Sequence, residues 1–240
     1  MGRSGAVVCQ EENAFWQPRL VEEIRDGLPE TAEEILRCVA RLPQDLRAMV
    51  DITPARVQEL QGRLTDIIEC GEPHIYLAGP MRLGRIIDRE WRSRYGAQLE
   101  AMGYCVVNTV VIETAMFGVD FLTFQEMQQQ LIMRGYYRTF AHIFGPVKEI
   151  DMALVHLLAR HEKSAIVAHY PTAVVKSGTD IECFEAYRLG VPVFIHLDGA
   201  REEVRPFLNE AWAELYRQRK FRAFHSWQRL MAHMAAWRQG

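Results

Sequence analysis

Short apolar runs that end near turn residues alternate with amphipathic stretches from residue 73 onward, and this alternation most constrains the fold. Apolar runs of this length, bounded by Gly and Pro, are typical of buried strands. The stretches between them have the apolar spacing of helices. Strand, helix, strand in succession predicts an α/β fold with a mainly parallel sheet. The runs are HIYLAGP (74–80), YCVVNTVVI (104–112), SAIVAHY (164–170) and PVFIHL (192–197).

The first part of the chain has a different pattern. Residues 14–70 carry apolar side chains at helical spacing, so residues 1–70 are expected to form a helical N-terminal extension and residues 71–240 the α/β domain. Thr53 and Pro54 have the N-cap and N1 order of a helix start, and Gly71 follows the end of that helix.

Further helices are expected along the rest of the chain. Gly145 and Pro146 interrupt the pattern between an aromatic stretch and a strongly amphipathic one, so we expect a break there. The expected helices cover residues 86–103, 123–135, 146–163, 201–220 and 225–240.

Composition excludes several classes of protein. The formal net charge of -3 argues against a nucleic-acid partner. The chain start lacks the apolar stretch of a signal peptide, and no apolar run has the length of a membrane span, so we expect a cytoplasmic protein with no membrane partner. The cysteines include no C-x-x-C pair, so neither a metal site nor a disulfide framework is expected. They are Cys9, Cys38, Cys70, Cys105 and Cys183.

The segment VVKSGTDIECFEAYRLGVPVFIHL, residues 174–197, carries the first candidate site. It follows an expected strand, and we place the start of its helix near Thr179 or Asp180. Ligands of parallel α/β sheets bind outside the carboxyl ends of strands, beside helix N-termini. Ser177, Gly178 and Thr179 could hold a phosphate or a sugar oxygen there, with Gly178 allowing a tight turn or a close approach. The alternative is that Thr179 or Asp180 only caps the helix.

Two carboxylates follow these polar residues. Glu182 is expected in the first helical turn, where the helix dipole stabilises its ionised form, and an ionised carboxylate in a cleft is a competent nucleophile. Glu185 lies one turn further along the same face, with a supporting role. The alternative is that both residues merely complement the dipole.

Two other places complete the candidate site. Asp151 has Val147 and Val155 four residues away on either side, so its carboxyl group is expected to be buried, with a raised pKa that suits proton transfer. A solvated edge position is the alternative. The stretch YLAGPMRLGR places Gly79 and Pro80 at the end of the first strand, and Arg82 could meet an anionic group. It lacks the P-loop and Rossmann signatures, so no cofactor is expected.

These motifs together resemble the nucleoside 2-deoxyribosyltransferase family and its nucleoside 5′-monophosphate N-glycosidase relatives. The resemblance covers residues 73–197 and rests on IYLAGP, the helix Asp before the third strand, SGTDIECFEA and GVPVFIHL. It implies a doubly wound, flavodoxin-like α/β fold that binds a small nucleoside or nucleotide without a cofactor. It also implies a homo-oligomer, in which parts of a neighbour complete the site.

The resemblance assigns roles to individual residues. Glu182 stands in the position of the nucleophile that attacks the anomeric carbon of the sugar. Asp151 corresponds to the helix Asp that positions the sugar or handles protons at the base. Ser177 and Gly178 correspond to the loop that holds a sugar hydroxyl or a 5′-phosphate. The residues expected to flank the ligand are Tyr76, Gly79 and Pro80.

The chain also departs from the family pattern. The segment between Asp151 and the third strand is longer than in the family, so His156 or His161 could lie nearer the site. Lys176 stands where many relatives have Asp, which favours an anionic ligand such as a nucleoside monophosphate. Two other readings stay open: a TIR-like enzyme that cleaves NAD, and a nucleotide-binding sensor without turnover.

Overall fold

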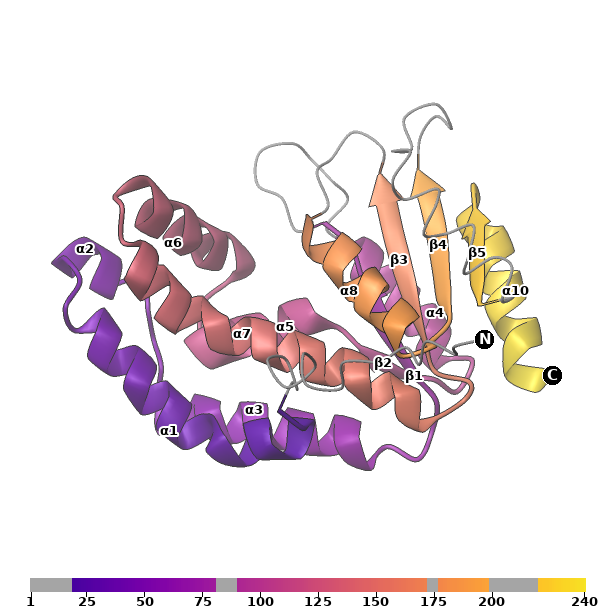
Figure 1. Cartoon of the computed structure of the whole chain (residues 1–240), viewed down its shortest axis with the longest axis horizontal. Helices are drawn as coiled ribbons and strands as arrows, with labels where there is room; N and C mark the ends of the chain where they lie inside the picture. The colour runs from indigo at the N-terminus through magenta and orange to yellow at the C-terminus, as the bar shows by residue number, and fades with distance from the viewer. Residues whose placement is uncertain (1–18, 81–89, 172–176, 199–219) are drawn as a thin grey trace, which may run out of the picture.

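The computed structural model describes residues 19–80, 90–171, 177–198 and 220–240. The described residues form one all-parallel sheet of five strands in the order β2-β1-β3-β4-β5 (Figure 1). This is a doubly wound order, with the switch point between β1 and β3. The predicted α/β fold is therefore confirmed. The strands are β1 His74–Ala78, β2 Cys105–Val107, β3 Ala165–Pro171, β4 Val193–Asp198 and β5 Phe221–Phe224.

Helices cover both faces of the sheet. Ile75 and Leu77 of β1 pack with α4 (Trp91–Glu100) and α10 (Trp227–Gln239), whereas Tyr76 and Ala78 face the cluster that contains α7 (Tyr137–Leu157) and α8 (Ser177–Arg188). Successive side chains of a strand point to opposite faces, so a strand covered on both sides is apolar throughout. This explains the uninterrupted apolar runs of the sequence.

The N-terminal helices extend the second of these layers. Helices α1 (Val21–Val39) and α3 (Pro54–Glu69) pack on each other, and α1 also packs on α7 (Figure 1). The short helix α2 (Gln44–Arg47) lies between α1 and α3 in the sequence. Their buried side chains belong to the same apolar cluster as α7, α8 and one face of the sheet. The side chain of Thr53 accepts a hydrogen bond from the backbone N–H of Arg56 at 3.4 Å, which confirms the predicted N-cap.

Residues 109–112 were expected to continue the second strand, and this prediction is wrong. Strand β2 ends at Val107, and α5 runs from Thr109 to Phe117. Ile112 and Phe117 of α5 are buried in the shared apolar cluster, and α5 packs against α3. Packing of this kind overrides the β propensity of a valine-rich run, because that propensity mostly reflects fit to a sheet surface.

The expected break at Gly145 and Pro146 is also wrong, because α7 continues through Pro146. Phe144 and Val147 on either side are buried in one cluster. Proline removes one helical hydrogen bond, and this burial offsets the loss. Strand β5 was not expected at all, whereas α6 (Phe121–Met133) matches its prediction.

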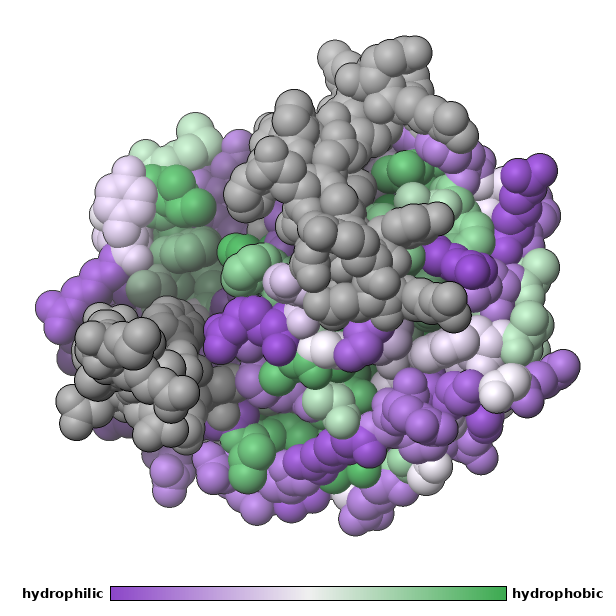
Figure 2. Space-filling view, turned by 45° about the vertical axis from the view of Figure 1, so that its right-hand side comes forward, coloured by the Kyte–Doolittle hydropathy of each residue, from purple (hydrophilic) through white to green (hydrophobic). Residues whose placement is uncertain are grey.

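The helices expected at 86–103 and 201–220 lie partly or almost wholly outside the described residues. Within the described part of the first, α4 is helical as expected. None of the described helices combines the length and the apolar character needed to cross a membrane. Figure 2 shows the hydrophobic residues of one face in patches separated by hydrophilic residues.

Gly79 directly follows β1 and lies against Trp91, the first residue of α4. A Cβ atom at this position would lie 2.5 Å from Cζ2 of Trp91 and 3.3 Å from the backbone oxygen of His169. The ring of Trp91 is 1% exposed and is stacked on the ring of His169, with 5.0 Å between their centroids. The indole therefore has no space into which it can retreat, and only glycine fits.

We expect Gly79→Ala to lower the free energy of unfolding by about 1–3 kcal/mol, the usual cost of overpacking a core. The matched control is Gly62→Ala. Gly62 lies in α3 with no atom within 4 Å of the added Cβ, so this change should stabilise the protein by roughly 0.5–1 kcal/mol. Urea denaturation of both variants measures the effects. Equal stability of the two variants would contradict the packing described at Gly79.

Candidate functional site

Glu182 is a buried carboxylate on α8. Its residue surface is 8% exposed, and α8 starts in Figure 1 beside the end where the arrows of β3 and β4 point. The helix begins at Ser177, earlier than expected, so Thr179 and Asp180 lie inside it. Glu182 therefore lies in the second turn, and the prediction that the dipole at the first turn stabilises its charge is wrong. Its ionisation depends instead on side chains of other elements.

Three elements contribute groups that act on Glu182. The Nζ atom of Lys148, on α7, lies 3.9 Å from Oε1 of Glu182. Burial raises the pKa of Glu182, while the charge of Lys148, the nearby side chain of Tyr76 and the charge of Arg92 act in the opposite direction. Burial is the largest of these effects, so the net pKa is above its ordinary value.

Arg92 connects the end of β1 with this carboxylate. It is buried on α4, and its Nη2 donates a hydrogen bond of 2.7 Å to the backbone oxygen of Gly79. Its guanidinium carbon lies 4.5 Å from the centroid of the Trp91 ring. Pro80, which follows Gly79 in the chain, is also buried. Tyr76 and Arg92 thus both act on Glu182, and Arg92 also contacts the backbone of Gly79.

Asp151 is buried, with 7% of its surface exposed, which confirms the prediction that it points away from solvent. It lies three residues after Lys148 on α7, and positions three apart in a helix are neighbours on one side. The side of α7 that carries Lys148 therefore also carries the buried carboxyl group of Asp151.

The other predicted binding residues have separate outcomes. Thr179 is buried on α8. Gly178 has a helical backbone with no atom within 4 Å of an added Cβ, so the tight turn expected there is wrong. Asp180 accepts a 2.8 Å hydrogen bond from the hydroxyl of Tyr170. Ser177 is the first residue of α8. The two basic residues expected to meet an anion, Arg82 and Lys176, lie outside the described residues.

Glu185 differs from Glu182 in its partners. Its Oε1 lies 2.9 Å from Nε2 of His156, on α7, and its Oε2 accepts a hydrogen bond of 3.2 Å from Nη1 of Arg188. The contact with His156 ties α8 to α7, whereas Arg188 lies on α8 itself. The alternative site residue His156 thus meets Glu185.

Lys148 and Arg92 were not identified from the sequence. Lys148 could have been found, because it lies one turn before Asp151 in the same amphipathic helix. Arg92 carried no such signal, because its role depends on how α4 meets β1. Among the described residues, one group of side chains could together bind a metal ion, namely Cys70, His74 and Cys105. These residues lie at the starts of β1 and β2, whereas Gly79 lies at the other end of β1.

No protein-family model, curated protein or solved structure was found to match the chain.

The raised pKa of Glu182 has a consequence for stability. Its neutral form is favoured in the folded protein, so its contribution to stability is full below the unfolded pKa, near 4.5, and is lost as the pH rises through the folded pKa. Gln cannot ionise, so we expect Glu182→Gln to gain thermal stability over the wild type between pH 4 and pH 7. Thermal melts across this range measure the difference.

The control is Glu185→Gln, which removes a carboxylate that is paired with His156 and Arg188 and should bring no such gain. A difference between Glu182→Gln and the wild type that stays constant with pH would contradict the burial effect at Glu182.

Proposed function

We propose that the chain is an enzyme that cleaves the N-glycosidic bond of a nucleoside or nucleoside 5′-monophosphate, or transfers the sugar to another base. Glu182 is the proposed nucleophile. The observation that carries the proposal is its buried carboxylate beside Tyr76 and Lys148, on the helix that follows β3. Ligands of doubly wound sheets bind at the carboxyl ends of strands beside the switch point, which here lies between β1 and β3.

The chemistry needs an ionised carboxylate in a site that excludes water. In the first step an oxygen of Glu182 forms a bond to C1′ as the C1′–N bond breaks, and the base leaves with the electron pair and takes up a proton. In the second step water, or a second base, attacks C1′ and releases the carboxylate, while its proton passes to solvent or to an acceptor group. The transition states resemble an oxocarbenium ion, which a carboxylate stabilises.

The neighbours of Glu182 suit this role. Tyr76 of β1 acts on the carboxyl group and lowers its pKa, which favours the ionised form. The charges of Lys148 and Arg92 oppose the effect of burial and favour the ionised form. Positive groups near the carboxylate also attract an anion, which favours a nucleoside 5′-monophosphate as the substrate.

We assign proton handling at the leaving base to Asp151. A departing base needs a proton, and a buried carboxyl group is a suitable donor near neutral pH. Asp151 is buried on the side of α7 that carries Lys148. Its role can be distinguished from that of Glu182. A base that leaves readily as an anion needs little help from a proton donor, so loss of Asp151 should slow its release less than loss of Glu182 does.

The assay is a panel of ribonucleosides, deoxyribonucleosides, their 5′-monophosphates and NAD, with and without a second base. Chromatography separates free base, free sugar and new nucleoside. Cleavage of NAD alone would favour the TIR-like reading, and binding without turnover would favour the sensor reading. Gel filtration with light scattering tests whether the chain forms the homo-oligomer that we propose with this function.

We expect Glu182→Gln to lower base release on the order of a thousandfold or more, because it removes a group that acts in the transition state. Glu185→Gln is the matched control on the same helix face and should keep most of the activity. Circular dichroism checks that both variants are folded. Base release by Glu182→Gln at the wild-type rate would exclude Glu182 as the nucleophile.

A further inference from the structure

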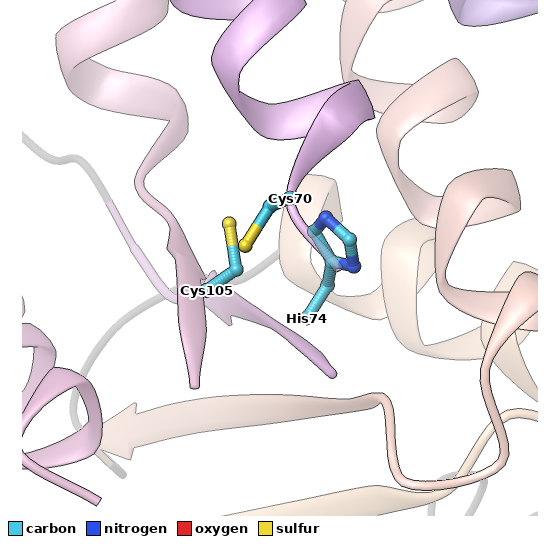
Figure 3. A group of neighbouring side chains, drawn as sticks. All are labelled: Cys70, His74 and Cys105. Atoms are coloured by element: carbon cyan, nitrogen blue, oxygen red, sulfur yellow. The ribbon is translucent and has the colours of Figure 1, made fainter. Parts of the chain in front are cut away.

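Three side chains that can bind a metal meet at the amino-terminal edge of the sheet (Figure 3). Cys70 follows the last residue of α3, His74 begins β1 and Cys105 begins β2. One potential ligand atom from each lies within 4.8 Å of those of the other two. The strand register explains part of this, because His74 and Cys105 are partners across the β1–β2 ladder. Figure 3 shows the two sulfur atoms close together beside the imidazole.

The donor set and its spacing suit zinc. Two thiolates and an imidazole are common Zn²⁺ ligands, with Zn–S near 2.3 Å and Zn–N near 2.0–2.1 Å, so ligand atoms in a tetrahedral site lie roughly 3.5–4 Å apart. Ligand atoms within 4.8 Å of one another must come somewhat closer to reach this geometry, and the ring of His74 must also turn. Cys70 and His74 are separated by three residues, a short chelating loop, and Cys105 approaches from the neighbouring strand.

We propose that Cys70, His74 and Cys105 bind one Zn²⁺ ion, with water in the fourth position. Binding converts both thiols to thiolates and releases two protons as two Zn–S bonds form. Cys70 and Cys105 are each partly exposed, so the ion can reach the site from solvent. This site does not depend on the function proposed for Glu182, because it lies at the opposite end of β1.

The environment of His74 supports a role as the third ligand. A neutral imidazole has one N–H to donate and one lone pair for an ion. The Nε2 atom of His74 lies 2.6 Å from the backbone oxygen of Ile67, a contact that holds the ring at the end of α3. A metal-bound imidazole uses one nitrogen for the ion and the other for such a carbonyl. Binding therefore requires the ring to turn its lone pair toward the sulfurs.

A disulfide between Cys70 and Cys105 is the competing use of these thiols. A disulfide would use Cys70 and Cys105 alone and leave the convergence of His74 unexplained, whereas a metal uses all three side chains.

A bound ion would connect the helical layer with the sheet. Cys70 is the C-cap residue of α3, and the other two ligands lie in the adjacent strands β1 and β2. Three ligands from these elements give the ion a structural role, because metal binding free energy adds to folding free energy when the site forms only in the folded chain.

The test uses the full chain, reduced and stripped with a chelator, and titrated with Co²⁺ as a spectroscopic probe. We expect thiolate-to-cobalt charge-transfer absorption that saturates at one equivalent, disappears when Zn²⁺ is added, and is absent in Cys70→Ser and Cys105→Ser. His74→Gln should weaken binding at least about tenfold. Cys38→Ser is the matched control, because Cys38 is a partly exposed thiol on α1 outside this group.

A second measurement needs no variant. In the wild type, Zn²⁺ should protect Cys70 and Cys105 from alkylation, as mapped by peptide mass spectrometry, and should leave Cys38 reactive. Zn²⁺ should also raise the melting temperature. The proposal is overturned if the folded wild type gives no charge-transfer band, if the band persists without both cysteines, or if the two thiols form a disulfide as readily with Zn²⁺ as without it.

Discussion

Strand β1 is buried on both faces, and the rest of the structure depends on this burial. Ile75 and Leu77 anchor the layer of α4 and α10, and Tyr76 anchors the layer that contains α7 and α8. Because β1 lies between β2 and β3, its carboxyl end is at the switch point of the sheet. Gly79 continues the chain there against Trp91 without room for a side chain. The strand that organises both layers therefore also positions the candidate site.

The candidate site balances two opposing electrostatic effects. Burial of Glu182 favours its neutral form, whereas Lys148, Tyr76 and Arg92 favour its charged form. These groups come from α8, α7, β1 and α4, so the balance exists only in the folded chain. Such a carboxylate reduces stability near neutral pH, a common feature of functional sites. Glu185, one turn away on the same helix, instead pairs with His156 and Arg188, as expected of a carboxylate with a structural role.

Much of the fold could be predicted from the sequence, because strands buried on both faces leave clear apolar runs between turn residues. The failures occurred where tertiary packing decides the local structure: the valine-rich residues 109–112 are helical because α5 packs on α3, and α7 continues through Pro146. The burial of Asp151 was predictable from its apolar neighbours. The convergence of Lys148 on Glu182, and of Cys70 on Cys105, was not, because in each pair more than thirty residues of chain separate two side chains that only the fold brings together.

The most direct test of the account is to look for the sugar on Glu182 itself. The wild-type chain is mixed with each nucleoside and nucleoside 5′-monophosphate, quenched in acid within the first turnover, digested and mapped by mass spectrometry. The account predicts that a substrate that yields free base also leaves its sugar, or sugar phosphate, attached to Glu182 in the peptide from α8. A sugar attached to another side chain, or no base and no adduct from any member of the panel, would contradict it.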